Sequence, residues 1–463
     1  MAGIGFKIQK LLAEDTYWGS VKGYFYSAVI SSGPWLISII CISVLGIISA
    51  PLLGNQENHI FRAWITYCYA ASLIISGAIQ VLMTRYLSDC IYKNDDESIF
   101  SSFITFSIPT FIIQFILAWV YLNTFGLPAI FCFVGAFLFS VINEIWIAMI
   151  YLSAAKDFVT IVVAYFVGGT VSILGSYFLV DSYGLSGLII GYSLGQTTLL
   201  AILISRILLE FPIRKWFNTD CLKYFIEHPQ LLSIGLFYNS AIWIDKILFW
   251  IFRGEEVHPG LYTCPFYETP CFLAFVTIVP TLSIFLIRVE TSFFTAYRDY
   301  YSKVVDKFPL AEILAEKEIV MDSLKLSFYK LMIFQGVITA ICIIIAPGLI
   351  KSLNMETFQL PILRITILGA FVHALLMVLM IIILYFDWKG LAFKVNLLFF
   401  MSNMVFTYYV MQFDLTLQGY GYFLSCLVTL AYATIMFFRR WEDLEYITFS
   451  SQPLGGLSWD ENP

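Results

Sequence analysis

Long apolar runs separated by short polar segments dominate this chain. Each run is close to the ~20 residues that an α-helix needs to cross the hydrocarbon core of a bilayer. The pattern therefore predicts twelve membrane-spanning helices. They cover Tyr24–Ser49, Ala63–Tyr86, Ile99–Leu122, Leu127–Tyr151, Phe158–Val180, Leu185–Leu209, Leu231–Phe252, Phe266–Ile287, Phe328–Leu349, Ile362–Phe386, Leu391–Met411 and Tyr420–Phe438.

The predicted spans divide six and six around a polar connector. We expect an all-α polytopic membrane protein with two six-helix bundles. Its predicted parts are a cytoplasmic segment 1–23, a bundle 24–209, a linker 210–230, a bundle 231–438 with a cytoplasmic amphipathic segment 288–327, and a cytoplasmic tail 439–463. "GYFYSA" at Gly23 and "GLFYNSA" at Gly235 open the first and seventh spans, which favours a parallel repeat of the kind found in transporters.

Composition agrees with a membrane protein. Of the 463 residues 60% are hydrophobic and only 13% are charged, against about 25% charged in soluble domains. Most of the 26 Lys and Arg fall on the predicted cytoplasmic segments when both termini are placed in the cytoplasm, as the positive-inside rule requires. Residues 1–23 have no long apolar core, so we expect no cleavable signal peptide.

No catalytic motif is visible in the chain. It has no phosphate-binding loop, nucleophile elbow or zinc-ligand spacing. The nine cysteines are scattered and form no CxxC pair, so we interpret them as packing residues. We expect no enzyme activity, no cofactor, no metal and no nucleic-acid partner.

Small residues recur at four-residue spacing in the fifth and sixth predicted spans. The fifth has Gly168, Ser172 and Ser176, and the sixth has Gly187, Gly191 and Gly195. This spacing lets helix backbones approach closely. We interpret it as tight packing within the first bundle.

Asp245 and Lys246 stand side by side in the middle of the seventh predicted span. Each charge at a helix centre costs roughly 2.5–3.5 kcal/mol on insertion scales. Adjacent helical residues point about 100° apart, so the two are expected to be poorly placed to neutralise each other. Asn239 and Trp243 share the face of Lys246, and this polar and aromatic strip is predicted to face water or other helices.

Other ionisable groups inside predicted spans are few. Glu144 lies in the fourth span, Glu268 at the start of the eighth and His373 in the tenth. With histidine neutral the set holds three acids and one base, so at least one carboxylate needs a proton or a cation. Two interpretations stay open: Lys246 pairs with Glu268 and fixes the bundle, or these groups serve a hydrated cavity or coupling. His373 is either a packed histidine or a functional one.

Two further segments are candidates for function. The first span contains a proline kink that could form a gate or merely a packing bend, at Ser31, Ser32, Gly33, Pro34 and Trp35. The charged segment Glu290–Lys325 carries aromatic residues that could dock a partner or lie on the membrane surface: Phe293, Phe294, Tyr297, Arg298, Tyr300 and Tyr301. The tail Arg439–Pro463 is a further possible contact.

Several strings resemble one family. They are "MAGIGFKIQKLL" at Met1, "ISSGPW" at Ile30, "MTRYLSDCIY" at Met83, "IDKILFW" at Ile244, "VETSFFTAYRDYYSKV" at Val289 and "VHALLMVLMIIILYFD" at Val372. Together, in this order and over essentially the whole chain, they resemble PelG, the inner-membrane exporter family of Pel exopolysaccharide systems.

The resemblance implies a fold, a substrate and partners. The fold is that of the multidrug/oligosaccharidyl-lipid/polysaccharide (MOP) flippase superfamily, with two six-helix bundles around a central cavity. The implied substrate is a polymer rich in N-acetylgalactosamine. The implied partners are a cytoplasmic glycosyltransferase (PelF-like), a cyclic-di-GMP-binding membrane protein (PelD-like) and a scaffold protein (PelE-like). The resemblance carries over no residue roles.

The leading hypothesis is a polysaccharide transporter in which Asp245 and Lys246 line a water-filled conduit between the bundles. Hydroxyl-rich polymer needs hydrogen-bond partners that lipid cannot supply. Three alternatives remain: an ion-coupled exporter of small cationic drugs that uses Asp245 and Glu144, a membrane-embedded acyltransferase that uses His373, and a structural anchor for the glycosyltransferase.

Overall fold

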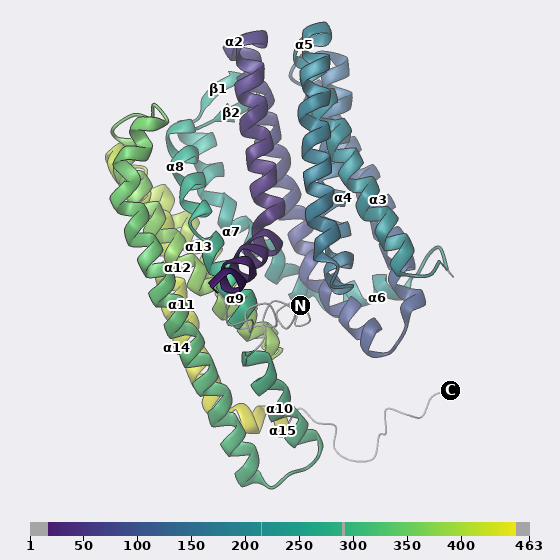
Figure 1. Cartoon of the computed structure of the whole chain (residues 1–463), viewed down its shortest axis with the longest axis vertical. Helices are drawn as coiled ribbons and strands as arrows, with labels where there is room; N and C mark the ends of the chain where they lie inside the picture. The colour runs from purple at the N-terminus through teal and green to yellow at the C-terminus, as the bar shows by residue number, and fades with distance from the viewer. Residues whose placement is uncertain (1–16, 214, 289–291, 451–463) are drawn as a thin grey trace.

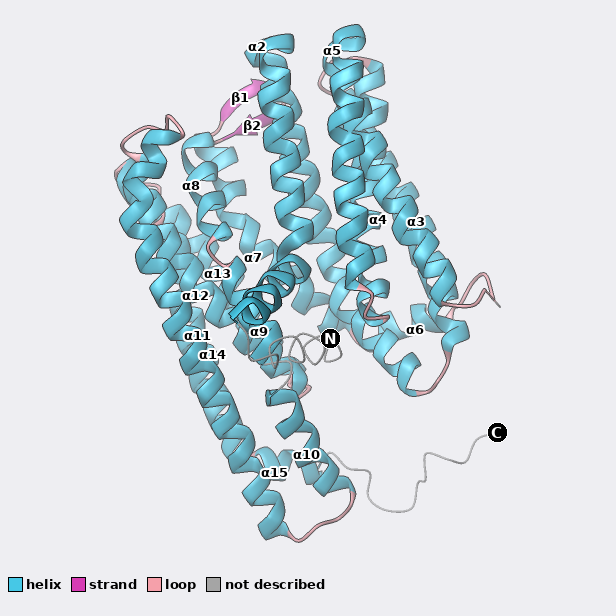
Figure 2. Cartoon of the chain, in the orientation of Figure 1, coloured by secondary structure: helices cyan, strands magenta, loops and turns pink. Residues whose placement is uncertain are grey.

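The computed structural model describes residues 17–213, 215–288 and 292–450, and these are almost entirely helical (Figures 1 and 2). The predicted segment 1–23 lies largely outside the described residues, as does the end of the tail. The elements are α2 (Tyr17–Tyr92), α3 (Asp96–Asn123), α4 (Ala129–Ala154), α5 (Phe158–Glu210), α6 (Asp220–Glu227), α7 (Pro229–Arg253), β1 (Glu255–His258), β2 (Leu261–Thr263), α8 (Pro265–Val276), α9 (Val279–Arg288), α10 (Phe294–Val305), α11 (Leu310–Ser352), α12 (Gln359–Tyr385), α13 (Lys389–Val410), α14 (Tyr420–Glu442) and α15 (Leu444–Ser450).

Ten helices in the described part of the chain are long and apolar enough to cross a membrane. The chain is therefore a multi-pass membrane protein. All nine cysteines are free and eight of them are buried, which confirms their interpretation as packing residues.

Glycines with non-helical backbone angles interrupt the two longest helices. Gly54 in α2 has φ 70° and ψ 166°, and Gly184 in α5 has φ 54° and ψ −134°. A residue with a Cβ is strained at such positive φ values, whereas glycine adopts them freely. Each glycine therefore marks a sharp change of direction within what is otherwise one continuous helix.

The two arms of α5 pack backbone to backbone. A Cβ added to Gly187 would collide with the carbonyl oxygen of Leu179, and one added to Gly191 would collide with the backbone of Ser176. Ser176 Oγ donates to the carbonyl oxygen of Leu188 at 3.0 Å, and Ser172 Oγ donates across the same contact. The predicted tight packing of the small residues is confirmed.

The first half of the chain, α2 to α5, meets the second half, α7 to α14, chiefly along α2 and α7. Figure 1 shows α2 between α3–α5 on one side and the later helices on the other. The two helices approach closely at Gly77 and Gly235, where a Cβ on Gly235 would collide with the carbonyl oxygen of Gly77. One apolar core cluster contains buried residues of both halves, including Leu82 of α2 and Leu375 of α12.

A two-stranded hairpin, β1–β2, extends from the second half onto the first. The hydroxyl of Tyr67 in α2 hydrogen-bonds the backbone of Tyr262, and Tyr121 in α3 donates to the carbonyl oxygen of Gly260 at 3.3 Å. Leu261 lies in the apolar core cluster that α2 to α5 build. The described residues are thus mostly helical, as expected, and the sequence does not predict the hairpin, because strands of four and three residues are too short for a pattern of alternating polarity to reveal.

Candidate functional site

The Asp245–Lys246 pair of α7 neutralises itself. Lys246 Nζ lies 3.0 Å from Asp245 Oδ1 and 2.9 Å from Oδ2, and it also donates to the carbonyl oxygen of Ile242 at 3.1 Å. The expectation that these neighbours are poorly placed to neutralise each other is wrong. The Cβ directions do diverge, but the four-carbon lysine stem is long enough to bring its ammonium group back over the preceding side chain.

The pair also has partners from other helices. Tyr267 of α8 donates to Asp245 Oδ2 at 2.8 Å. The Lys246 ammonium lies 5.0 Å from the ring centre of Phe275, 5.7 Å from that of Tyr422 and 6.0 Å from that of Trp243. Aromatic faces attract a cation, most strongly where water is excluded. Both charges are thus balanced by contacts within the second half.

Burial of this pair corrects the expected conduit. Asp245 is 0% exposed and Lys246 is 6% exposed. In this conformation the two charges lie inside the second half and do not line a hydrated path. Sequence periodicity places them on a polar and aromatic strip, but at this pair the strip is covered by aromatic side chains of α8 and α14.

His373 of α12 joins the same buried cluster. Its Nε2 lies 3.2 Å from the hydroxyl of Tyr238 in α7, and its Nδ1 lies 2.8 Å from the hydroxyl of Tyr422 in α14. The ring is 4% exposed and also contacts Phe275 edge-on at 6.0 Å. Both nitrogens are hydrogen-bonded and the ring has no access to solvent, so His373 ties three helices together.

Glu268 belongs to a different set of contacts. It accepts hydrogen bonds from the Trp250 indole and from the backbone N–H of Cys264, at the start of α8, at 2.7 Å. Within the described residues Lys246 pairs with Asp245 and not with Glu268, so of the two open interpretations the Lys246–Glu268 pair is not the one observed. The Trp250 ring that Glu268 holds stacks on Tyr67 of α2 with ring centres 4.6 Å apart. Glu268 therefore supports a contact between the two halves.

Asn239 and Trp243 lie nearer to the boundary between the halves. Both side chains are partly exposed. Asn239 Nδ2 donates to the carbonyl oxygen of Gly235 at 3.0 Å, and its side chain covers the space that a Cβ on Gly77 would need. Asn239 therefore lies at the contact of α2 with α7, and Trp243 packs beside Trp250 with ring centres 6.3 Å apart.

Glu144 lies in the first half, between α3 and α4. Thr110 Oγ1 donates to Glu144 Oε1 at 2.8 Å. The other carboxylate oxygen is buried without a hydrogen-bond partner, as are both amide atoms of Gln114 and of Asn143. These are buried polar atoms in need of protons, water or a cation.

The proline segment of α2 is packed. Ser32, Gly33 and Pro34 are buried, and a Cβ added to Gly33 would lie 3.6 Å from a methyl group of Val162 in α5. Ser38 Oγ donates to the carbonyl oxygen of Pro34 at 3.0 Å. The side chains of Ser31 and Trp35 lie outside the described residues, so the gate stays a prediction.

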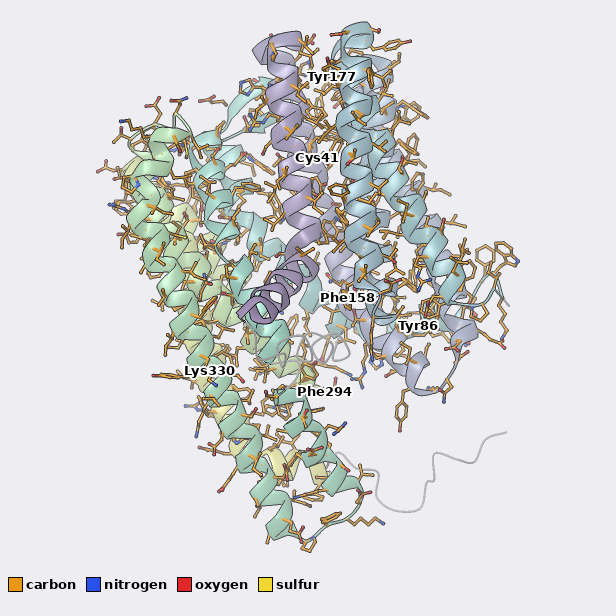
Figure 3. The ribbon with its side chains drawn as sticks, viewed as in Figure 1. Cys41, Tyr86, Phe158, Tyr177, Phe294 and Lys330 are labelled. Carbon is orange, nitrogen blue, oxygen red and sulfur yellow. The ribbon has the colours of Figure 1, made fainter. Side chains whose placement is uncertain are left out.

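The predicted docking aromatics hold α10 onto the bundle. Phe293 and Tyr300 are fully buried, and Tyr297 donates to the carbonyl oxygen of Tyr385 at 2.8 Å. Phe294 lies where α10 leaves the bundle (Figure 3), with its ring 6.4 Å from that of Tyr385. Tyr301 packs on Tyr297 with ring centres 4.7 Å apart. Among the six, only Arg298 is clearly exposed, which corrects the picture of an aromatic docking surface.

Sequence reasoning missed the tyrosines that complete the buried cluster. Tyr267 binds Asp245, while Tyr238 and Tyr422 bracket His373. The chain has 28 tyrosines, so residue type alone singles out none of them. Only Tyr238 carried a signal, because helical periodicity places it on the face of Asp245.

Known structures with the same fold are transporters. An outward-facing multidrug resistance MATE family transporter of the MOP superfamily aligns with TM-score 0.64 at 11% identity, over 91% of this chain and 96% of that one. A MOP superfamily transporter from Pyrococcus furiosus aligns with TM-score 0.65 at 11% identity, over 92% of this chain and 96% of that one. An inward-facing MATE family transporter aligns with TM-score 0.61 at 12% identity, over 90% of this chain and 99% of that one. No curated protein matches the chain in sequence.

A family match is more specific than these folds. The PelG exopolysaccharide exporter family (EPS-E) matches residues 1–449, which is nearly the whole chain. This chain belongs to the PelG family of exopolysaccharide exporters.

Proposed function

We propose that this protein moves a Pel-type, N-acetylgalactosamine-rich polysaccharide across the bacterial inner membrane, along the boundary between its two halves. The observation that supports this most is the contact of α2 with α7. It combines close backbone approach at Gly77 and Gly235 with partly exposed Asn239 and Trp243. Amide groups and aromatic rings are suitable for hydrogen-bonding and stacking on sugar, and separating two rigid halves would expose them.

Contacts close both ends of this boundary, and they would have to break for polymer to pass. At one end the β1–β2 hairpin binds α2 and α3 through Tyr67 and Tyr121. At the other end Arg85 of α2 lies 3.7 Å from Asp387, which follows α12. Rocking of one half against the other, as in transporters built from repeats, would open one end at a time.

The span count and orientation are part of this proposal. Gly184 divides α5 into two arms of about bilayer length, and α8 with α9 makes one further crossing of roughly 36 Å at 1.5 Å per residue. Twelve spans in two six-helix bundles then place α6, α10 and α15 on one side. That side is cytoplasmic by the positive-inside rule, with both termini there.

We further propose that the protein works within a synthase complex. The partners would be the PelF-like glycosyltransferase, the PelD-like cyclic-di-GMP-binding protein and the PelE-like scaffold. Helices α10 and α11 form a hairpin that projects beyond the rest of the bundle (Figure 1). Its tip presents exposed apolar side chains, among them Val305, Phe308 and Leu310. A soluble partner could bind this tip, in place of the buried aromatic residues at its base.

The path is tested by cross-linking the hairpin to α2. Cysteines at Tyr67 and Tyr262 would be joined with a short bis-maleimide in cells that carry the whole secretion system. We expect secreted polymer to fall at least ~10-fold on cross-linking, since the halves can then no longer separate at this end. Unchanged secretion at full cross-linking would exclude passage between the halves.

A matched control uses the hairpin alone. Glu255 and Thr263 are paired across β1 and β2, so cysteines there staple the hairpin to itself without reaching α2. Secretion should persist in this variant. The purified chain should also fail to transport a cationic dye, and dye transport would favour the multidrug alternative.

A further inference from the structure

A cavity of about 330 Å³ lies between the first turns of α13 and the last turns of α14. Gly390, Leu391 and Lys394 line it from α13, and Met436, Arg439 and Arg440 line it from α14. Its size falls in the range of ~300–1,000 Å³ that small-ligand sites occupy. It is distinct from the boundary between the halves and from the buried Asp245 cluster.

Positive charge dominates the lining of this cavity. Lys394, Arg439 and Arg440 face it together with one carboxylate, that of Asp443. Among the described residues these three cations form no ion pair, whereas nearby Lys389 is paired with Asp387 at 3.4 Å. The cavity therefore has a net positive charge that no side chain of the described chain neutralises.

The Arg440 side chain packs against an aromatic ring and has a buried nitrogen without a hydrogen-bond partner. Its guanidinium carbon lies 5.6 Å from the ring centre of Trp388, which orients the planar group. Its Nε is buried and has no hydrogen-bond partner. A buried, unpaired donor of a charged group is costly unless a ligand accepts its hydrogen bond.

The remaining walls are apolar and continue toward the lipid. Leu391, Met436 and Ile447 line the cavity beside the cations. Ile435, one turn before Arg439, and Phe438 are exposed on the outer surface of α14 at 54% and 46%. A ligand with an anionic head and an apolar tail would satisfy both parts of this surface.

We propose that this cavity binds the phosphate headgroup of an anionic phospholipid. Basic pockets between spanning helices at a membrane surface recognise such headgroups. Arg440 and Arg439 would donate to the phosphate oxygens, Lys394 would add charge, and the acyl chains would lie along α14. In the orientation proposed above the lipid belongs to the cytoplasmic leaflet.

The test is lipid binding by the purified full chain. Native mass spectrometry would follow titration with phosphatidylglycerol, with phosphatidylcholine and with inorganic phosphate. We expect phosphatidylglycerol to bind at least ~10-fold more tightly than phosphatidylcholine, and the K394Q/R439Q variant to lose that preference. Both side chains are exposed, so the variant should fold. R440Q should weaken binding further.

The matched control removes two exposed cations elsewhere, in R298Q/K325Q, and should bind as the wild type does. Retention of the phosphatidylglycerol preference in K394Q/R439Q would overturn the proposal. Equal binding of phosphatidylcholine would do the same. If inorganic phosphate competes fully at low concentration, the site takes a soluble anion and the lipid assignment is wrong.

Discussion

The two halves of this protein each bury an acidic side chain, but they treat it in opposite ways. In the second half Asp245 accepts from Lys246 on both oxygens and from Tyr267 on one. In the first half Glu144 accepts from Thr110 on one oxygen, and its other oxygen has no partner. The contrast separates an acid whose charge is compensated within the protein from one whose charge is not.

This difference bears on function. A compensated pair contributes to packing and has no need of an external ion. Glu144 needs a proton or a cation to be stable in its buried position. If the transporter couples to an ion, Glu144 is therefore the better candidate of the two, and the following substitutions test that comparison.

The largest effect is expected for Lys246→Met. It leaves the carboxylate of Asp245 buried without its cation, and breaking a buried pair in this way costs about 3–5 kcal/mol. Thermal unfolding of the purified protein in detergent would measure it. The double variant D245N/K246M removes both charges and should recover at least half of the lost stability. A single variant as stable as the wild type would contradict the compensated pair.

A smaller loss is expected for Tyr267→Phe. A hydrogen bond to a charged group contributes about 1.5–3 kcal/mol, and this one joins α8 to Asp245. The same unfolding assay in an Asp245→Asn background supplies the control. There the loss should shrink, because the acceptor is no longer charged; an equal loss in both backgrounds would assign the effect to packing alone.

For Thr110→Val we expect a loss of about 0.5–1.5 kcal/mol, typical of a hydrogen bond between uncharged groups. This expectation treats Glu144 as uncharged, because it is buried and one of its carboxylate oxygens has no hydrogen-bond partner. Unfolding would be measured with and without added sodium. A loss as large as that of Tyr267→Phe would show that Glu144 is charged and that a bound cation accompanies it.

The smallest change in stability is expected for Glu144→Gln, within ~1 kcal/mol, because the amide keeps an acceptor for Thr110 and adds no charge. Polymer secretion by cells should nevertheless fall several-fold if Glu144 takes part in coupling. Normal secretion with normal stability would remove Glu144 from the mechanism. Thr105→Val is a matched control in α3, because it also removes a hydroxyl with hydrogen bonds, to Asn218 N–H at 3.0 Å and to the carbonyl oxygen of Ser101 at 2.8 Å, but none of these partners is a carboxylate.

Sequence patterns predict the membrane class well, because the length of an apolar run is set by the bilayer itself. They also predict the small-residue contacts of Gly187 and Gly191. They fail at Lys246 and Glu268, where the outcome depends on the reach of a flexible side chain and on neighbours brought in by other helices. Aromatic residues such as Phe293 and Tyr422 are equally ambiguous, since the same ring suits an exposed docking surface and a buried contact.

Helix α11 is much longer than a single membrane span requires. At 1.5 Å per residue its 43 residues extend about 65 Å, roughly twice the thickness of the hydrocarbon core. The helix is continuous, and Lys317 near its far end is fixed by Glu445 at 2.7 Å. A protein bound at the tip would therefore contact the same helix that crosses the bilayer, so its binding and the tilt of that span would be linked.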